Sequence, residues 1–194
     1  MMTRNRLTTN CIRSKVTLKK SGLQPLEHWG ISKFKKGKTL KLVEITFHGT
    51  VFQGVGIRNI KKGLEAICPE ISTEPFTVGR RGVTVIPFVR GFANDGCCLF
   101  LDLMDYLLFV QEDKGILGCY DAVIMNGIRN IYKLLTSLKA YKKCLCIMPY
   151  DMMGQVIALT LEDKWNTSVK ILGAEYEKIA SKRGSIINNE NIYE

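Results

Sequence analysis

The alternation of apolar and polar residues predicts a β-strand where the body of the chain begins. From Leu40 onward the sequence is rich in β-branched and aromatic residues, and Val43, Ile45 and Phe47 alternate with polar residues. A period of two places these three side chains on one face of an extended segment. We therefore expect a half-buried strand at this position.

Four later segments also read as strands. Pro87 lies in the segment 83–89, where it favours an edge strand or a bulge. The stretch from Cys97 to Val110 is apolar enough for a buried strand or the arm of a hairpin. Residues 144–149 and 155–161 are shorter apolar runs of the same kind.

Three segments have the 3.6-residue period of amphipathic helices, and each repeats four apolar residues at helical spacing. They are 57–67, ended by Pro69, then 128–138, and 168–181, ended by Gly184. Strands and helices follow one another in mixed order. The prediction is a single compact α+β domain over residues 39–184, with a mixed or antiparallel sheet and about three helices, and a flexible tail at 185–194.

The positive charge is concentrated at the start of the chain. Residues 1–41 contain eleven Lys or Arg and one acid, Glu27, which accounts for the whole formal net charge of +10. Residues 1–38 show no sustained period, so we expect a largely flexible basic arm whose partner is anionic, either nucleic-acid phosphate or an anionic membrane surface. The candidate binding residues of the arm are Arg4, Arg6, Arg13, Lys15, Lys19, Lys20, Lys33, Lys35, Lys36 and Lys38.

Arg80 and Arg81 form a second candidate anion site, because Gly79 and Gly82 on either side predict a turn that presents two guanidinium groups. The alternative is an ordinary turn with two solvated arginines.

Gly54 and Gly56 suggest a phosphate cradle before a helix, but neither nucleotide-binding motif is complete, and a loop is the favoured reading.

Signs of catalysis and metal binding are weak. Asp102 and Asp105 would point to opposite faces of the expected strand. The seven cysteines lack the spacing of a zinc hairpin, and their odd number favours buried thiols in a reducing compartment. Only His28 and His48 are available as a base for a nucleophile. We therefore expect no enzyme, no metal and no cofactor.

No segment predicts membrane insertion. The longest apolar stretch, Cys97 to Val110, is too short to span a bilayer, and the chain opens without an apolar signal segment. Membrane contact would then be peripheral, through the cationic arm.

The order of elements resembles a viral protein family. A basic arm, an apolar strand (residues 42–51), a helix, the turn at 79–82 and an aromatic-bearing strand (85–89) are similar to the matrix proteins of negative-strand RNA viruses, most of all to the plant rhabdovirus group. The chain lacks the Pro-Pro-x-Tyr and Pro-Thr-Ala-Pro budding motifs that many animal-virus relatives carry.

The resemblance implies a non-enzymatic structural protein. Such a protein forms homo-oligomers, condenses the viral nucleocapsid or RNA and links it to anionic membrane. It would be located in the virion, in the host cytoplasm and at the inner membrane surface, with the nucleus as a further location. The alternative is an RNA-binding viral accessory protein of the movement or silencing-suppressor type, for which the arm offers only Trp29 and Phe34 as stacking residues.

Overall fold

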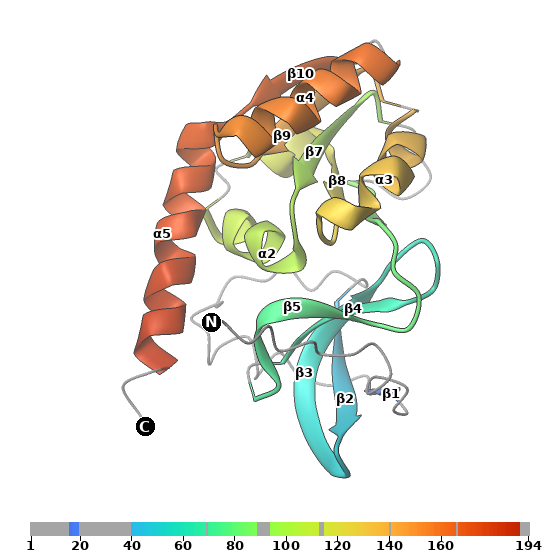
Figure 1. The fold of residues 1–194 in the computed structure, drawn as a ribbon, viewed down its shortest axis with the longest axis vertical. Coiled ribbons are helices and arrows are strands. Elements are labelled where there is room, and N and C mark those ends of the chain that lie inside the picture. The colour runs from blue at the N-terminus through green and yellow to red at the C-terminus, as the bar shows by residue number, and fades with distance from the viewer. Residues whose placement is uncertain are drawn as a thin grey trace, which may run out of the picture.

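Two five-stranded sheets, joined by a shared core, make up the computed structural model of this protein (Figure 1). The structure describes residues 16–19, 40–68, 70–88, 94–112, 115–139, 141–165 and 167–190. Four α-helices lie in these residues, where the sequence predicts about three. The α+β class and the single domain are confirmed.

The first sheet is an antiparallel meander in the order β1-β2-β3-β4-β5. A two-residue turn joins β2 to β3, with positive φ at His48 (47°) and Gly49 (82°), as a type I′ turn requires. The β1 strand lies within the predicted arm and pairs with β2, Val16 opposite Ile45. The strands are β1 (Val16–Lys19), β2 (Lys41–Phe47), β3 (Thr50–Arg58), β4 (Leu64–Cys68) and β5 (Ser72–Val78).

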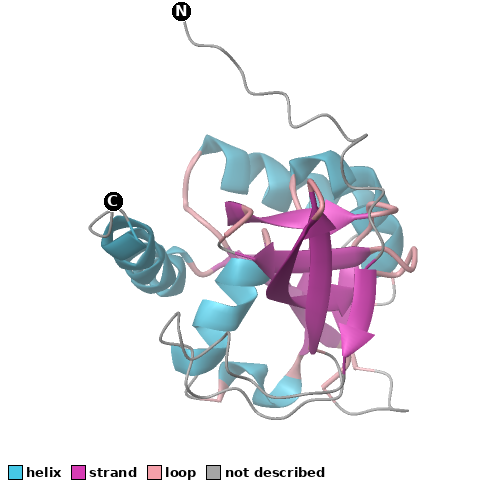
Figure 2. Ribbon diagram, turned by 90° about the horizontal axis from the view of Figure 1, so that it is seen from below, coloured by secondary structure: helices cyan, strands magenta, loops and turns pink. Residues whose placement is uncertain are grey.

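The second sheet is mixed, in the order β10-β9-β7-β8-β6. The strands β10, β9, β7 and β8 run parallel to one another, and β6 is an antiparallel edge strand, as Pro87 predicts. Strands and helices alternate along this part of the chain, so helices lie on both sides of the strands (Figure 2). The strands are β6 (Thr84–Ile86), β7 (Gly96–Phe100), β8 (Asp121–Ile124), β9 (Lys143–Ile147) and β10 (Ser168–Ile171).

The helices α2 (Leu103–Glu112) and α5 (Gly173–Glu190) pack against each other on one face of this sheet. The helices α3 (Ile131–Leu138) and α4 (Met152–Trp165) share a second core with its other face. Two short 3-10 helices, η1 (Ile116–Cys119) and η2 (Ile128–Asn130), complete the described elements.

The α2 helix unites the two sheets. Leu103 and Leu107 of α2 belong to the same buried cluster as Val55 and Ile57 of β3 and Phe100 of β7. Since one cluster of apolar side chains draws on both sheets, the domain has a continuous core.

Four sequence predictions of local structure are wrong. The predicted helix at 57–67 is the end of β3, a turn and β4, and the predicted strand at 97–110 ends at Phe100, where the chain turns into α2. The segment 155–161 is helical within α4. The last predicted helix begins as the strand β10, and its helical part continues past Gly184 to Glu190.

Within the described residues, no helix has both the length and the apolar character needed to cross a membrane.

Candidate anion-binding site

The Arg80–Arg81 turn lies at the carboxyl edge of the parallel strands. It connects β5 to β6, and β6 runs antiparallel to β8 with Thr84 opposite Ile124. The chain therefore enters β6 beside the point where β8 ends. Ligands of open α/β sheets bind outside the carboxyl ends of the strands. Both arginine side chains are exposed at this edge, as the predicted turn requires.

Asn59 fixes one side of the turn from the end of β3. Its side chain is buried, and its Nδ2 donates to the Arg80 carbonyl oxygen at 2.7 Å and to Glu65 Oε1 at 2.6 Å. Its Oδ1 accepts from the backbone N–H groups of Lys61 and Gly63 at 2.9 and 3.0 Å. One amide thus ties the β3–β4 turn to the backbone that carries Arg80.

Gly63 allows the backbone of the β3–β4 turn to approach the backbone of the Arg80–Arg81 turn closely. A Cβ atom at this position would lie 1.9 Å from the Arg80 carbonyl oxygen, far inside van der Waals contact. Only glycine fits here without moving the Arg80–Arg81 turn away from β4.

The other side of the turn is held by the loop after β8 and by α3. Asn126 has positive φ (56°), and its Nδ2 donates to the Gly82 carbonyl oxygen at 2.9 Å. Lys133 of α3 donates from Nζ to the Arg81 carbonyl oxygen at 3.0 Å. The two arginines are therefore carried by a backbone that is bonded to elements on both sides.

Six exposed basic side chains lie on this turn and on the neighbouring elements that are bonded to it, and we call them the basic cluster. They come from the β3–β4 turn, from the Arg80–Arg81 turn and from η2 and α3: Lys61, Lys62, Arg80, Arg81, Arg129 and Lys133. Lys62 itself has positive φ (64°), and its carbonyl oxygen accepts from Arg58 Nη1 at 3.0 Å.

The buried acid beneath the basic cluster is Glu65, which is 3% exposed. Burial raises the pKa of this carboxyl group, while hydrogen bonds from Thr77 and Asn59 and the positive charges of Arg81 and Lys133 lower it. Thr77 Oγ1 donates to Glu65 Oε2 at 2.7 Å. Glu65 therefore orients the polar residues below the turn and is itself inaccessible to a ligand.

The arrangement suits an extended polyanion. Two guanidinium groups can each form paired hydrogen bonds with phosphate oxygens, and the four neighbouring cations add positive potential over the same surface.

The structure describes three of the residues predicted to bind anions. Arg80 and Arg81 lie in the basic cluster, and Lys19 is the last residue of β1. The remaining residues predicted for the arm, Arg4, Arg6, Arg13, Lys15, Lys20, Lys33, Lys35, Lys36 and Lys38, lie outside the described residues.

Sequence reasoning missed the four other members of the basic cluster. Lys133 lies within the predicted helix at 128–138, and it is 52 residues from its partner Arg81 in the chain. No local signal links such distant positions. Lys61 and Lys62 were assigned to a helix that is in fact a turn between two strands.

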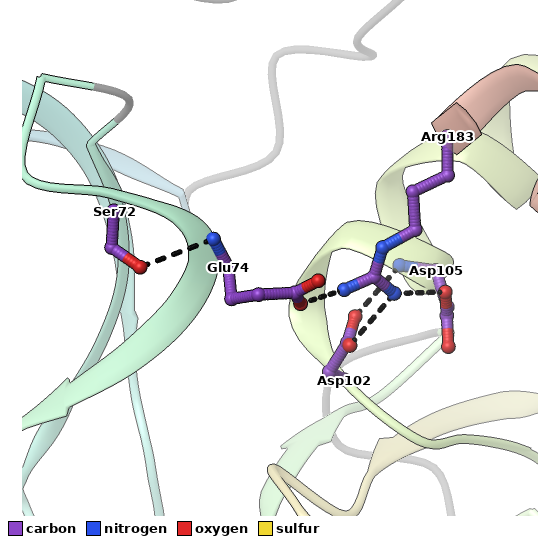
Figure 3. A network of polar contacts seen from close by, with 5 residues as sticks. All are labelled: Ser72, Glu74, Asp102, Asp105 and Arg183. Carbon is purple, nitrogen blue, oxygen red and sulfur yellow. Dashed lines mark hydrogen bonds and ion pairs between the residues drawn. The ribbon is translucent and has the colours of Figure 1, made fainter. Parts of the chain in front are cut away.

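The expectation that Asp102 and Asp105 point to opposite faces is wrong. Asp102 caps α2, because its Oδ1 accepts from the Asp105 N–H at 3.0 Å. Arg183 of α5 binds both carboxylates through Nη1, at 2.9 Å for Asp102 and 2.8 Å for Asp105, and binds Glu74 of β5 through Nη2 (Figure 3). This acidic network joins β5 of the first sheet and the start of α2 to the last helix.

Neither Gly54 nor Gly56 forms a phosphate cradle. Both lie within β3, where a Cβ atom at Gly54 would be 2.5 Å from the Ile67 carbonyl oxygen of β4. No helix follows them, so close strand packing is the physical reason for these glycines.

The described cysteines are free, and all but Cys119 are buried. Cys144 lies 3.7 Å from Cys97 and 3.8 Å from Cys146, sulfur to sulfur. The hydrogen bond from the Cys146 thiol lowers the pKa of Cys144, but its contact with Cys97 and its burial raise that pKa well above the ordinary thiol value. The contact with Cys144, and next burial, raise the pKa of Cys146 in the same way. Within the described part of the chain, no group of three or more His, Cys, Asp or Glu residues is placed to hold a metal ion.

Comparison of the chain with protein-family models, with curated protein sequences and with solved structures found no match.

Proposed function

We propose that this protein is a non-enzymatic, matrix-like structural protein that binds the phosphates of RNA and self-associates. The basic cluster carries the proposal, because the backbone of Arg80 and Arg81 is bonded to β3 on one side and to α3 on the other. Cations carried by a fixed backbone cost less loop ordering on binding than cations on a loose loop.

The charge of the first 41 residues supports the same function. This segment accounts for the formal net charge of +10, and β1 attaches it to the edge of the first sheet. The protein therefore has two sources of positive potential, the N-terminal segment and the basic cluster, and together they would condense a ribonucleoprotein. Anionic membrane is the second partner in this proposal, contacted peripherally by the same N-terminal cations.

The test is a titration of fluorescent single-stranded RNA with the full chain across a series of salt concentrations. Replacing Arg80 and Arg81 together with Ala should weaken binding and reduce the slope of log K against log salt by about 1.4, since each phosphate contact contributes about 0.7 on a single strand. The matched control replaces two exposed lysines outside the basic cluster, Lys164→Ala with Lys170→Ala.

An equal loss in the control and the arginine variant would show that the basic cluster is not a binding site. Sedimentation with phosphatidylserine vesicles and with neutral vesicles tests the membrane part separately. A monomer that binds RNA and ignores both kinds of vesicle would instead fit the accessory-protein reading.

A further inference from the structure

The outer face of α4 is apolar, although nothing in the described part of the chain covers it. Met152, Val156 and Leu159 are 82%, 54% and 63% exposed, and their spacing places them along one line of the helix. The opposite face, with Ile157 and Leu161 each 1% exposed, packs into the core with α3 and the second sheet. The helix is therefore apolar on both faces.

The neighbouring helix α3 and the short helix before it also expose apolar residues. Tyr132 of α3 is 81% exposed and Ile128 of η2 is 46% exposed. The helices α3 and α4 pack side by side on the same face of the second sheet. Exposed apolar residues on two helices that pack side by side are typical of a protein interface.

The two helices carry opposite charges at their exposed positions. The segment 128–139 contains Arg129, Lys133 and Lys139 and no acid. The segment 151–165 contains the exposed acids Asp151, Glu162 and Asp163 against one base, Lys164. An apolar stripe with acids at both ends would be repelled by an anionic lipid surface and by RNA.

We propose that this face binds a second copy of the chain in a two-fold dimer, with α4 of each copy on α3 of the other. A two-fold interface is self-complementary, so the acidic helix of one copy meets the basic helix of its partner twice. The exposed methionine, valine, leucine and tyrosine side chains form the apolar centre, and the charged residues form the rim. This inference deepens the self-association in the proposed function by assigning it a surface.

The test is the oligomeric state of the full chain by sedimentation velocity over a range of protein concentrations. Wild type should dimerise, and Leu159→Glu should be monomeric, because it buries a charge at the centre of the interface. The matched control is Val51→Glu, which adds the same charge at a 59% exposed apolar residue, the second of β3. The turn between β2 and β3 lies at the opposite end of the molecule from α4 (Figure 1). Val51→Glu should dimerise like wild type.

Charge exchange identifies the pairing of the helices. Arg129→Glu alone, or Glu162→Lys with Asp163→Lys, should raise the dimer dissociation constant about tenfold, since each reversal disrupts two symmetry-related contacts. All three substitutions together should restore wild-type dimerisation. Circular dichroism melting of each variant checks that the fold is kept.

A wild-type chain that stays monomeric, or a dimer that Leu159→Glu leaves unchanged, would overturn the proposal. Failure of the combined charge variant to recover would rule out α4 on α3 as the arrangement. RNA binding by Leu159→Glu, measured in the same samples, separates the two proposals. RNA binding that is retained or strengthened in the monomeric variant supports both proposals, because the dimer interface would cover Arg129 and Lys133 of the basic cluster and leave Arg80 and Arg81 open to RNA. A wild-type chain that stays monomeric and still binds RNA refutes the self-association and leaves the RNA-binding part of the proposed function in place.

Discussion

Arg183 Nη1 lies 2.8 Å from Asp105 Oδ1, although the two residues are 78 positions apart in the chain. Asp105 is 1% exposed, and its Oδ2 has no hydrogen-bond partner among the residues that the structure describes. The ion pair connects the first turn of α2 with α5 and includes Asp102 and Glu74 (Figure 3). In this position burial favours the neutral form of the carboxyl group, and the ion pair with Arg183 favours its charged form.

Stability should fall as the pH rises through the titration of Asp105. Burial, and next the negative charge of Asp102, raise the pKa of Asp105 to about 7 from a reference value of 3.8, against the opposing charge of Arg183. Between these two pH values the folded state keeps a proton that the unfolded state has lost. The contribution of Asp105 to the free energy of unfolding is therefore fully present below about pH 4, and it is lost progressively as the pH rises to about 7.

Urea unfolding of wild type and Asp105→Asn between pH 4 and pH 8 measures this effect. The free energy of unfolding of wild type should decrease relative to that of Asp105→Asn by at most about 1.4 kcal/mol per pH unit over the titration range, and the difference should be constant above it. Parallel pH curves for the two proteins would mean that Asp105 does not titrate in this range.

Removing the cation of the acidic network should be costly. Arg183→Met leaves Asp102 and Asp105 without their shared counter-charge, and breaking a buried pair in this way costs about 3 kcal/mol. Lys178→Met on the same helix is the control, because its ion pair with Glu175 is exposed and worth less than about 1 kcal/mol. Equal losses in chemical unfolding would contradict a special role for Arg183.

The close approach at Gly63 predicts a coupled loss of stability and RNA affinity. Gly63→Ala places a Cβ atom against the Arg80 carbonyl oxygen, so the β3–β4 turn and the Arg80–Arg81 turn must separate. We expect a destabilisation of about 2 kcal/mol and weaker RNA binding, measured by thermal unfolding and by RNA titration.

The control for this substitution is Gly184→Ala in α5, where an added Cβ atom meets no described residue within 4 Å outside its own stretch of helix. Alanine in the helix should stabilise the protein by up to about 1 kcal/mol and leave RNA binding unchanged. If Gly63→Ala behaves in the same way, the close packing of the two turns is not important.

Cys119 should be the first of the described thiols to react with an alkylating reagent. It is exposed, whereas the other described cysteines are buried, and burial raises the pKa of Cys68 to about 12. Mass spectrometry of a Cys11→Ser protein after brief treatment with iodoacetamide should find modification at Cys119 alone. Early labelling of Cys144 or Cys146 would indicate that the second sheet opens readily.

Sequence periodicity predicts the elements that have a clear amphipathic pattern. The alternation of Val43 and Ile45 is confirmed in β2, where both side chains are buried, and the stripe that includes Leu135 and Leu138 is confirmed in α3. In both cases one face packs on the core and the other faces solvent, so the period is visible in the residues themselves.

The errors arise where apolar residues do not reveal which element they belong to. Ile57 and Ile67 have helical spacing only because a turn between β3 and β4 separates them. The apolar run from Cys97 to Phe109 is buried in both a strand and a helix, and the capping residue Asp102 was its only internal boundary signal. In α4 the exposed Val156 and Leu159 obscure the helical period.

The candidate site was predictable only in part. The flanking glycines identify the Arg80–Arg81 turn, because a turn is a local feature of the sequence. Its supports, Asn59 and Lys133, are 21 and 52 residues away from the carbonyl groups that they bind. Such contacts depend on strand order in two sheets, which one sequence does not specify.

The position of Arg183 sets the order in which the acidic network can form during synthesis. A ribosome makes the chain from its N-terminus, so Glu74, Asp102 and Asp105 all emerge before the arginine that is 109, 81 and 78 residues further along. Until then α2 can pack on the sheets only with Asp105 protonated or with a carboxylate buried against its solvation cost. Because Arg183 lowers the pKa of Asp105, a nascent chain that still lacks Arg183 favours the neutral carboxyl group. We therefore expect α2 to pack first with Asp105 protonated, and the ion pair to form only when α5 arrives.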